Sequence, residues 1–350
     1  MQIQKNTWDV VCNSPTQLLT ILDDSTGFEV QLSDFGATLV RVKVPDKDGK
    51  VLDLNYGQDD PNDYIKYGGF LGAVTGRVAN RIANACFTLN EHKYPLHVNA
   101  AGSHCLHGGK ESFNFKIWNL ENVEENQDEI KVTFKYLSPD MEEGFPGNLE
   151  TLVTYTIEPN TIGWEITATT DKPTIVNITN HAYWNLDGVH TLIDEQEIRV
   201  DSTSYMPADG DCLATGEVWN VKDHNIDLHE FTRFQDIFAT FGDLDNNFFL
   251  DGHYTKNSIK DTFLAATVRS PSTGITMDVH TSEPCVQLYS GNFMDSIVSF
   301  GKQCNKHGAI CLETQRPPNA INNPVFARDV ILHPGEEYFH KTVHRFSIDI

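Results

Sequence analysis

Basic residues are scarce in this sequence. Its 350 residues include 26 lysines and arginines against 49 aspartates and glutamates, which gives a formal net charge of −23. A surface this acidic repels the phosphates of nucleic acids and of anionic membranes, so we expect neither as a partner. The same charge weakly disfavours phosphorylated substrates, although a local basic pocket would overrule the average.

Long apolar runs are also missing. No segment approaches the roughly 20 apolar residues of a membrane-spanning helix. The N-terminus, MQIQKNTWDVV, has neither the basic nor the apolar region of a signal peptide. Seven cysteines are scattered, odd in number and mostly set among apolar residues, which indicates reduced, buried thiols rather than a disulfide framework. We therefore expect a cytoplasmic protein. The cysteines are Cys12, Cys86, Cys105, Cys212, Cys285, Cys304 and Cys311.

The common cofactor motifs are absent. No G-x-G-x-x-G follows a strand, and there is no Walker A loop, no H-E-x-x-H and no G-x-S-x-G. Cys304, His307 and Cys311 resemble half of a zinc site, but no second pair of ligands follows at a suitable spacing. The acidic run that begins at Asp243 starts like a calcium loop but lacks its glycine. The sequence predicts no cofactor and no metal.

Short segments of alternating apolar and polar residues recur along the chain. In KVTFKY (131–136) every second residue is apolar, the pattern of a half-buried strand. Similar patterns predict strands at 151–157, 196–202 and 344–350, and a hairpin over 262–282 around a Pro-Ser-Thr-Gly turn.

Helical patterns are few. Phenylalanines at helical spacing predict a helix over 229–241, and a second short helix is expected at 61–67. No internal repeat, low-complexity tract or linker divides the chain. We expect an all-β fold, a large antiparallel β-sandwich with a few short helices, in a single domain covering 1–350.

One strand pattern ends on an acid. Residues Ala309–Leu312 are apolar, Glu313 follows them, and a pair of prolines that a central strand would not tolerate comes soon after. An acid at a strand end is usually an ordinary loop residue. Here the strand is expected to act as a rigid platform that holds the Glu313 carboxylate in place.

Other polar residues also interrupt apolar segments. Each alone has an ordinary explanation, such as a structurally satisfied histidine or an aspartate that caps a turn. Together, aromatic rings beside Asn, Gln, Asp and His are what a sugar site needs, and a carboxylate plus an imidazole can act as base and acid. The sequence thus predicts a carbohydrate-processing pocket. The candidates lie in GRVANRI, SHCLHGG, NITNHAYWNLDG, DLDNNFFL and CVQLYSGNF: Asn80, Arg81, His107, His181, Tyr183, Asp245 and Gln287.

These segments, in this order, resemble the aldose 1-epimerase family, also called galactose mutarotases. The likeness runs from GRVANRI near residue 76 to LETQ and PGEEY (334–338). It implies a galactose mutarotase-like supersandwich and a cofactor-free isomerase that interconverts the α and β anomers of aldohexoses such as D-galactose and D-glucose. It also implies a monomer or weak homodimer whose partner is a small sugar.

The resemblance assigns roles to particular residues. Glu313, in Leu-Glu-Thr-Gln, matches the catalytic base, and His181, in Thr-Asn-His, matches the general acid. His107 matches a substrate-binding histidine that helps the acid step. We expect Glu313 to be ionised and His181 protonated at neutral pH, with the neighbouring carboxylate raising the pKa of the imidazole.

The remaining matches concern sugar binding. By this likeness Asn80 and Arg81 contact the sugar, Tyr183 lies nearby in the pocket, Asp245 holds sugar hydroxyls, and Gln287, in the Val-Gln-x-Tyr strand, binds the substrate.

The sequence also departs from the family pattern. The departures are Asp243, Leu244 and Asn246 around Asp245, Ser112 and Asn114 after the His-Gly-Gly motif, and Met141 in the SPDMEEGFPG loop. All of these residues are expected near the pocket, where they would bear on sugar preference.

Three alternatives stay open at this point. A hexose-6-phosphate 1-epimerase is the nearest enzyme, and a glycoside hydrolase would use two acids, for which Asp245 and Glu313 are available. A non-catalytic sugar-binding homologue would have lost the acid or the base, and this chain has both.

Overall fold

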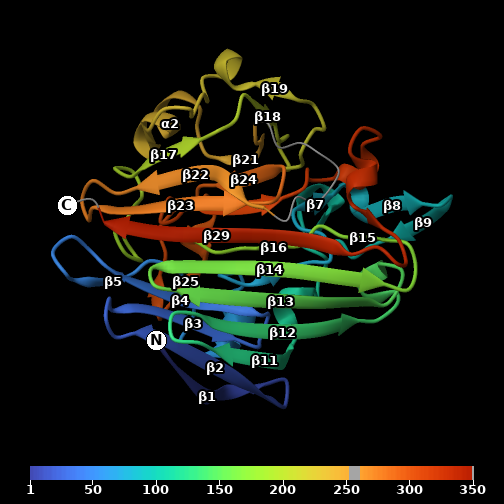
Figure 1. Ribbon diagram of the computed structural model, residues 1–350. Helices are drawn as coiled ribbons and strands as arrows, with labels where there is room; N and C mark the ends of the chain where they lie inside the picture. Colours follow the sequence, from blue (N-terminus) through green and yellow to red (C-terminus); the bar gives the residue numbers. More distant parts are fainter. Residues whose placement is uncertain (252–260, 349–350) are drawn as a thin grey trace.

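Antiparallel strands are the dominant secondary structure, as the alternating pattern predicts. The computed structural model describes residues 1–251 and 261–348 (Figure 1). Within these residues the α-helices are α1 (Pro61–Tyr67) and α2 (Phe234–Thr240). None of the helices in the described part of the chain is long and apolar enough to cross a membrane.

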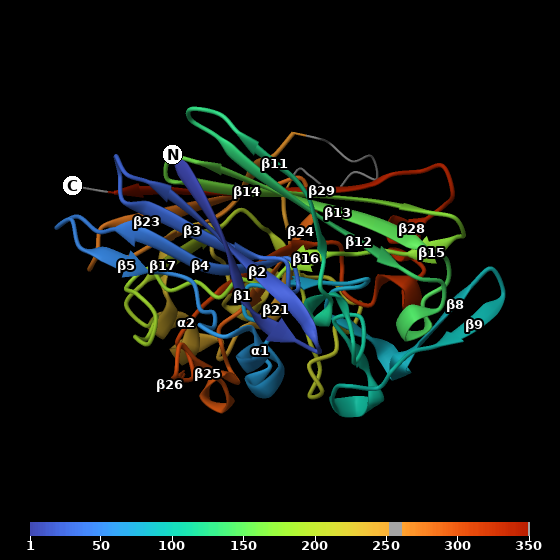
Figure 2. The ribbon, with the colours of Figure 1, turned by 90° about the horizontal axis from the view of Figure 1, so that it is seen from below.

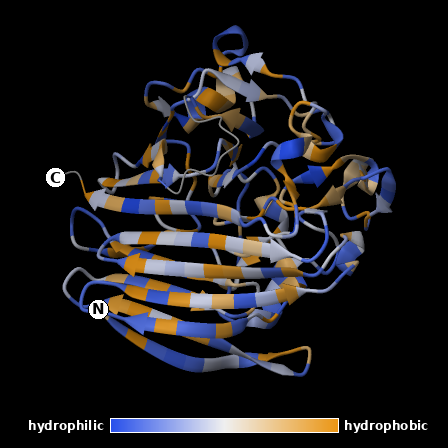
Figure 3. Cartoon of the chain, turned by 45° about the vertical axis from the view of Figure 1, so that its right-hand side comes forward, coloured by the Kyte–Doolittle hydropathy of each residue, from blue (hydrophilic) through white to orange (hydrophobic). Residues whose placement is uncertain are grey.

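The largest layer is a sheet of nine strands. Its strands alternate hydrophilic and hydrophobic residues along their length, and banding of this kind is visible in Figure 3. This alternation places one face of the sheet in the core. In spatial order the strands are β11 (Asn119–Glu125), β12 (Ile130–Ser138), β13 (Leu149–Glu158), β14 (Thr161–Thr170), β29 (Tyr338–Ile348), β23 (Ile275–Thr281), β22 (Phe263–Arg269), β17 (Glu197–Val200) and β20 (Thr232–Arg233).

Two five-stranded sheets pack against this layer (Figures 1 and 2). The N-terminal sheet contributes Phe28, whose ring lies 6.0 Å from that of Phe346 on β29. Its strands, in spatial order, are β1 (Gln2–Val11), β2 (Ser14–Asp23), β3 (Phe28–Ser33), β4 (Thr38–Pro45) and β5 (Val51–Asp53).

The second five-stranded sheet packs against β29 and carries several of the predicted site residues. Its Thr314 hydroxyl lies 2.6 Å from the Thr342 hydroxyl of β29, so the two layers are in direct contact. Its strands, in spatial order, are β19 (Trp219–Asn220), β18 (Ser204–Met206), β21 (Asp245–Phe249), β24 (Cys285–Tyr289) and β27 (Cys311–Gln315).

Short two-stranded pairs and 3₁₀ turns complete the fold. The pairs are β6 (Val74–Thr75) with β16 (Thr179–Asn180), β7 (Arg81–Ile82) with β10 (Cys105–Leu106), β8 (Cys86–Leu89) with β9 (His92–Pro95), β15 (Thr174–Ile175) with β28 (Ile331–Leu332), and β25 (Val298–Ser299) with β26 (Lys302–Gln303).

One apolar core joins the layers. Buried side chains of all three large sheets pack in a single cluster, from Leu19 on β2 to Phe346 on β29. This continuity supports the single domain expected from the sequence, which stays a prediction. The all-β sandwich expected from the strand pattern is confirmed.

The expected strands are found, with differences at their ends. Residues 131–136 and 151–157 lie inside β12 and β13, and the hairpin at 262–282 is β22 and β23. The strand expected at 196–202 is shorter, because β17 ends at Val200. The strand at 344–350 is the end of β29, and residues 349–350 lie outside the described part of the chain.

The helix predicted over 229–241 is wrong in its first part. Only Phe234–Thr240 is helical, because Thr232 and Arg233 form β20 and pair with β17. Phe231 faces two guanidinium groups instead of the core, those of Arg269 at 3.8 Å and Arg199 at 5.3 Å. The short helix at 61–67 is confirmed; Asp60 caps it by accepting a hydrogen bond from the Asn62 amide.

Candidate active site

The register of the second five-stranded sheet aligns polar side chains on one face. Asn247 of β21 lies opposite Gln287 of β24, which lies opposite Glu313 of β27. In the neighbouring row, Asp245 lies opposite Tyr289, which lies opposite Cys311 (cross-strand pairs of β21, β24 and β27). Since side chains alternate along a strand, both rows point to the same side, away from the nine-stranded sheet.

Glu313 does not lie at a strand end as predicted from the sequence. It is the middle residue of β27, which continues to Gln315, and it is 2% exposed. Its neighbours Leu312 and Thr314 face the core, where Thr314 contacts His340 and Thr342 of β29. Because the residues before and after Glu313 are both packed in the core, the position of the Glu313 side chain is fixed.

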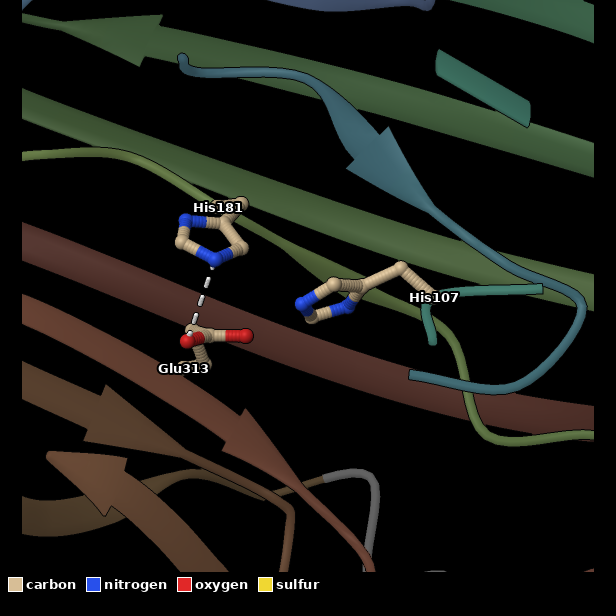
Figure 4. A group of neighbouring side chains, drawn as sticks. All are labelled: His107, His181 and Glu313. Atoms are coloured by element: carbon tan, nitrogen blue, oxygen red, sulfur yellow. Dashed lines mark ion pairs between the residues drawn. The ribbon is translucent and has the colours of Figure 1, made fainter. Parts of the chain in front are cut away.

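His181 follows the two-residue strand β16. Its backbone amide donates to the Ala73 carbonyl, and the Gly72 amide donates to the His181 carbonyl, so both sides of its backbone are held. The Thr179 hydroxyl donates to the Thr314 carbonyl and ties β16 to β27. These bonds bring His181 Nε2 to 3.5 Å from Glu313 Oε1 (Figure 4).

His107 is locked to Asn80. The His107 amide donates to the Asn80 carbonyl, and the Asn80 amide donates to His107 Nδ1 at 3.2 Å. Because Nδ1 accepts this bond, the neutral imidazole carries its proton on Nε2. His107 is thus a hydrogen-bond donor even when it is uncharged.

The glycine pair after His107 packs closely against the chain itself. A Cβ at Gly108 would lie 1.9 Å from the Gly76 carbonyl oxygen. The absence of a side chain at Gly108 therefore allows the His107 segment to pack against the Gly76 segment.

Most of the predicted site residues line one cavity of about 230 Å³. The volume suits a ligand smaller than a typical drug-sized molecule. Gln287 does not line it, but its amide donates to Asp245 Oδ1 at 2.8 Å. The predicted residues that do line it are Asn80, Arg81, His107, His181, Tyr183, Asp245 and Glu313.

The sequence analysis missed the aromatic part of the cavity wall. Tyr289 and Phe293 lie in the CVQLYSGNF segment, Tyr67 ends the helix predicted at 61–67 and Phe70 follows it, but none of the four was predicted to line the site. A signal was present in Gly68–Gly72, where three glycines surround Phe70 and all three have positive φ. Phe70 itself has φ of 58°, a backbone conformation that is rare for a bulky residue and often found at functional sites.

Aromatic rings enclose His181. Tyr183 stacks on it at 4.9 Å and Phe70 stacks at 5.9 Å, while His107 lies edge-on at 5.0 Å. The Tyr183 hydroxyl donates to the Gly69 carbonyl. These contacts orient the imidazole and exclude water from it.

Burial decides the charge of the acid–base pair, contrary to the expectation. It lowers the pKa of His181 to about 4 and raises the pKa of Glu313 well above its usual value, an effect that neighbouring Asp245 adds to. The prediction of a raised imidazole pKa is wrong, because desolvation by the surrounding rings outweighs the nearby carboxylate. The 3.5 Å contact is thus a neutral pair unless a proton moves from Glu313 to His181.

His107 is also uncharged at neutral pH. Burial lowers its pKa well below the usual value, and His181 and Arg81 lower it further. Burial raises the pKa of Asp245, while Arg81 and the Gln287 hydrogen bond lower it. Arg81 Nη1 lies 3.8 Å from Asp245 Oδ2.

Some buried polar atoms of the site have no hydrogen-bond partner among the described residues. They include Glu313 Oε2, Gln287 Oε1 and Arg81 Nε. Buried polar groups are nearly always satisfied, so such atoms commonly mark where a ligand or water binds.

A metal does not fit the site well. The ligand atoms of His107, His181 and Glu313 lie within 4.8 Å of one another. However, the free lone pair of His107 is on Nδ1 and is taken by the Asn80 amide, which leaves a protonated Nε2 toward the others. The half zinc site in the sequence is not assembled either, because His307 Nε2 pairs with Asp243 at 2.8 Å.

Two of the departures from the family pattern lie away from the cavity. Asn114 is buried beside Ser112, and Met141 is half exposed; neither lines the cavity, so this expectation is wrong for both. Asn246 lies next to Asp245 on β21, but its side chain is on the opposite face of the strand.

All seven cysteines are free thiols, as expected. Four of them are buried and one, Cys12, is exposed.

Comparisons with known proteins agree with this arrangement. The family model described as Aldose 1-epimerase matches residues 18–345. Galactose mutarotase of Bos taurus is 35% identical over 330 residues, 93% of this chain and 92% of the relative. Aldose 1-epimerase of Escherichia coli (strain K12) is 34% identical over 343 residues, 95% of each chain.

Solved structures show the same fold. An aldose epimerase homologue from C. elegans superposes with a TM-score of 0.85 at 30% identity and covers 95% of this chain and 100% of its own. Galactose 1-epimerase from Lactobacillus acidophilus NCFM gives a TM-score of 0.85 at 24% identity over 100% of this chain and 99% of its own, which is evidence for the fold alone.

Proposed function

Because this chain belongs to the aldose 1-epimerase family, we propose that it interconverts the α and β anomers of aldohexoses such as D-galactose and D-glucose. Family membership makes the protein an isomerase of the racemase and epimerase class that acts on sugars. The observation that carries the finer proposal is the buried pair Glu313–His181 on the wall of a cavity of about 230 Å³.

In this proposal Glu313 is the base and His181 the acid. Glu313 takes the proton of the C1 hydroxyl while His181 Nε2–H protonates the ring oxygen, and the C1–O5 bond breaks to give the open aldehyde. Rotation about C1–C2 and ring closure with the roles reversed give the other anomer. No redox change occurs, so the reaction needs no electron carrier, and each proton transfer contributes about 10²–10⁴-fold.

The neutral pair agrees with this chemistry. Glu313 and His181 share one exchangeable proton, which lies on the carboxyl group in the neutral pair and on Nε2 in the ion pair. For the ring of a bound pyranose to open, this proton has only to move from Glu313 to His181 across the 3.5 Å contact. The ion pair opens the ring, and the neutral pair, with protonated Glu313 and neutral His181, is the state that closes it. The two forms are therefore successive states of one reaction.

The pH range of activity follows from these pKa shifts. The one-proton state gains a second proton as the pH falls below about 4, the pKa of His181, and loses its proton as the pH rises through the raised pKa of Glu313. Both values belong to the coupled pair rather than to either residue alone. We expect activity between these limits.

The rest of the site would hold the sugar. Arg81 and Asp245 offer charged hydrogen-bond partners to hydroxyls, and His107 Nε2–H is a neutral donor. Tyr289 and Phe293 offer apolar faces for the C–H side of the ring. Support for this comes from the unpartnered atoms Glu313 Oε2 and Arg81 Nε.

The deciding experiment is polarimetry on freshly dissolved α-D-galactose and α-D-glucose. The native protein is expected to hasten the approach to equilibrium rotation, and Glu313→Gln to lose about 10²–10⁴-fold in kcat. Glu150→Gln, a partly exposed position on β13, serves as the control and should keep native activity. A Glu313→Gln variant as active as the native protein would remove Glu313 from the mechanism.

The alternative enzymes use other constellations. A glycoside hydrolase needs two carboxyl groups that flank the scissile bond. Here the Asp245 carboxylate pairs with Arg81 and accepts a hydrogen bond from Gln287, and Glu313 pairs with the imidazole of His181. A hexose-6-phosphate epimerase needs cations for the phosphate, and Arg81 is the one lysine or arginine among the described residues that line the cavity. Aryl glycosides and hexose 6-phosphates should therefore not react in the same assays.

A further inference from the structure

One strand contacts both nitrogens of the His181 ring. Glu313 Oε1 lies 3.5 Å from Nε2, and Cys311 Sγ lies 3.7 Å from Nδ1. Cys311 and Glu313 are two residues apart on β27, so their side chains point to the same face. The carboxylate has an evident chemical role, whereas the thiol has none in the reaction described above.

The thiol is held in a dry environment. Cys311 is fully buried in a cluster with Tyr183, Tyr289 and Ala309. Burial raises the pKa of its thiol well above the usual value, and Glu313 adds to this effect, so it stays uncharged. A neutral sulfur is a weak hydrogen-bond acceptor that does not pull His181 toward the imidazolium form as a carboxylate would.

The two contacts suit one tautomer of His181. In the neutral pair, protonated Glu313 donates to Nε2, so Nε2 needs its lone pair and the imidazole proton must be on Nδ1. Nδ1–H then points at Cys311 Sγ. When Nε2 gains a proton during turnover, Nδ1 keeps its own, so the Nδ1–H···S contact persists through the reaction.

We propose that Cys311 is a positioning residue for the epimerase reaction: its sulfur accepts Nδ1–H of His181 and so reserves Nε2 for proton exchange with Glu313 and the sugar. The proposal rests on the function proposed above, because it presumes that His181 is the acid. It concerns which nitrogen reacts and involves no covalent step at sulfur.

Other groups around His181 are less suited to this task. Glu313 faces Nε2, His107 lies edge-on at 5.0 Å, and the Tyr183 hydroxyl is used by Gly69. Tyr289 is edge-on at 6.3 Å, and its hydroxyl accepts from the Phe293 amide. The backbone of His181 itself also hydrogen-bonds the ring and raises its pKa, so it is the competing partner for Nδ1.

The tautomer can be measured directly. Long-range ¹H–¹⁵N correlation spectra of the ¹⁵N-histidine-labelled native protein at pH 7 are expected to show His181 with a protonated Nδ1 and an unprotonated Nε2. His181→Gln identifies its signals. In Cys311→Ala the signals should move toward a mixture of the two tautomers, whereas Cys311→Ser, whose hydroxyl can still accept, should keep the native pattern.

Kinetics provide the second measurement. Cys311→Ala is expected to lower kcat about tenfold with little change in KM, as loss of an orienting partner does, and Cys311→Ser should recover most of the activity. Cys304→Ala is the matched control, since Cys304 is a buried cysteine in the same apolar cluster and makes no contact with His181 among those described. A general loosening of the cluster would affect both alanine variants alike.

The outcomes separate this inference from the proposed function. A native tautomer in Cys311→Ala means that the backbone contact alone holds Nδ1, and it overturns the inference whether or not the enzyme is a mutarotase. A native protein without activity on either anomer, with the spectra as expected, would refute the proposed function but not the contact. Equal losses of kcat in Cys304→Ala and Cys311→Ala would mean that Cys311 contributes only to packing.

Discussion

At the scale of single residues, the site depends on polar groups placed where water is excluded. Glu313 and His181 are 2% and 4% exposed, and each would ordinarily be costly to bury. They are tolerated because each can be neutral and because each has the other as a partner. In the mechanism proposed above, the same burial that shifts their pKa values allows them to exchange a proton near neutral pH.

We expect Gln287 to support substrate binding rather than proton transfer. Its side chain donates to Asp245 Oδ1 at 2.8 Å and has no contact with His181 among those described. We expect Gln287→Leu to raise KM for galactose by about tenfold, the value of one hydrogen bond to a charged group, with kcat nearly unchanged.

Initial rates over a range of sugar concentrations separate these two constants. Gln303→Leu, at an exposed position of β26, provides the comparison. A fall in kcat with unchanged KM would place Gln287 in the proton-transfer machinery instead.

At the scale of elements, the site depends on short strands that are anchored by buried polar side chains. The segment between β6 and β7, which ends at Asn80, is anchored by the side chain of Arg77. The Arg77 guanidinium donates to the Ser138 hydroxyl and carbonyl and to the carbonyls of Pro139 and Pro146, at 2.9–3.0 Å. Burial lowers the pKa of Arg77 to about 10, so it remains charged at neutral pH.

Replacing Arg77 should destabilise the fold. In Arg77→Met the bonded carbonyls would lose their donor while still buried, and we expect the free energy of unfolding to fall by about 3 kcal/mol or more. Urea denaturation followed by tryptophan fluorescence measures this loss. Arg328→Met, at an exposed position, should stay within about 0.5 kcal/mol of the native protein, and an equally small effect at Arg77 would contradict the anchoring role.

At the scale of the whole molecule, the layers meet over aromatic and histidine side chains. His344 on β29 stacks on Trp164 at 4.8 Å and contacts the tilted ring of Trp184 at 5.0 Å, and neither of its nitrogens has a partner among the described residues. Burial lowers its pKa to about 3. In the folded protein His344 therefore stays neutral at pH values at which the same histidine is protonated in the unfolded chain.

This histidine should make the native protein sensitive to acid. As the pH falls below about 6.5, the unfolded state binds a proton at position 344 that the folded state does not, so stability falls by up to about 1.4 kcal/mol per pH unit from this group. His344→Leu removes that contribution. Urea unfolding at pH 7 and at pH 5 should show a smaller loss for the variant, and an equal loss would mean that His344 is not buried and neutral in the fold.

The strand pattern and the ordered motifs were readable without a structure. A period of two identified β12, β13 and the β22–β23 hairpin, because alternation depends on neighbours in the chain. The predicted helix over 229–241 was wrong at its start, because pairing of Thr232 and Arg233 with β17 is a contact with a distant segment.

The residue types of the site were also readable from the sequence, but their relations were not. Glu313, His181 and His107 stood out as acid, imidazole and imidazole in apolar surroundings, and the fold brings them together (Figure 4). Strand register, which pairs Gln287 with Glu313 and Tyr289 with Cys311, decided which side chains share a face. The packing of Phe70 and Tyr183 around His181 decided its pKa, opposite to the expectation, because desolvation depends on every group nearby and not on sequence neighbours. The sequence by itself thus determined the all-β class and the chemical groups, and only the tertiary structure decided their distances, their charges and the contact between Cys311 and His181.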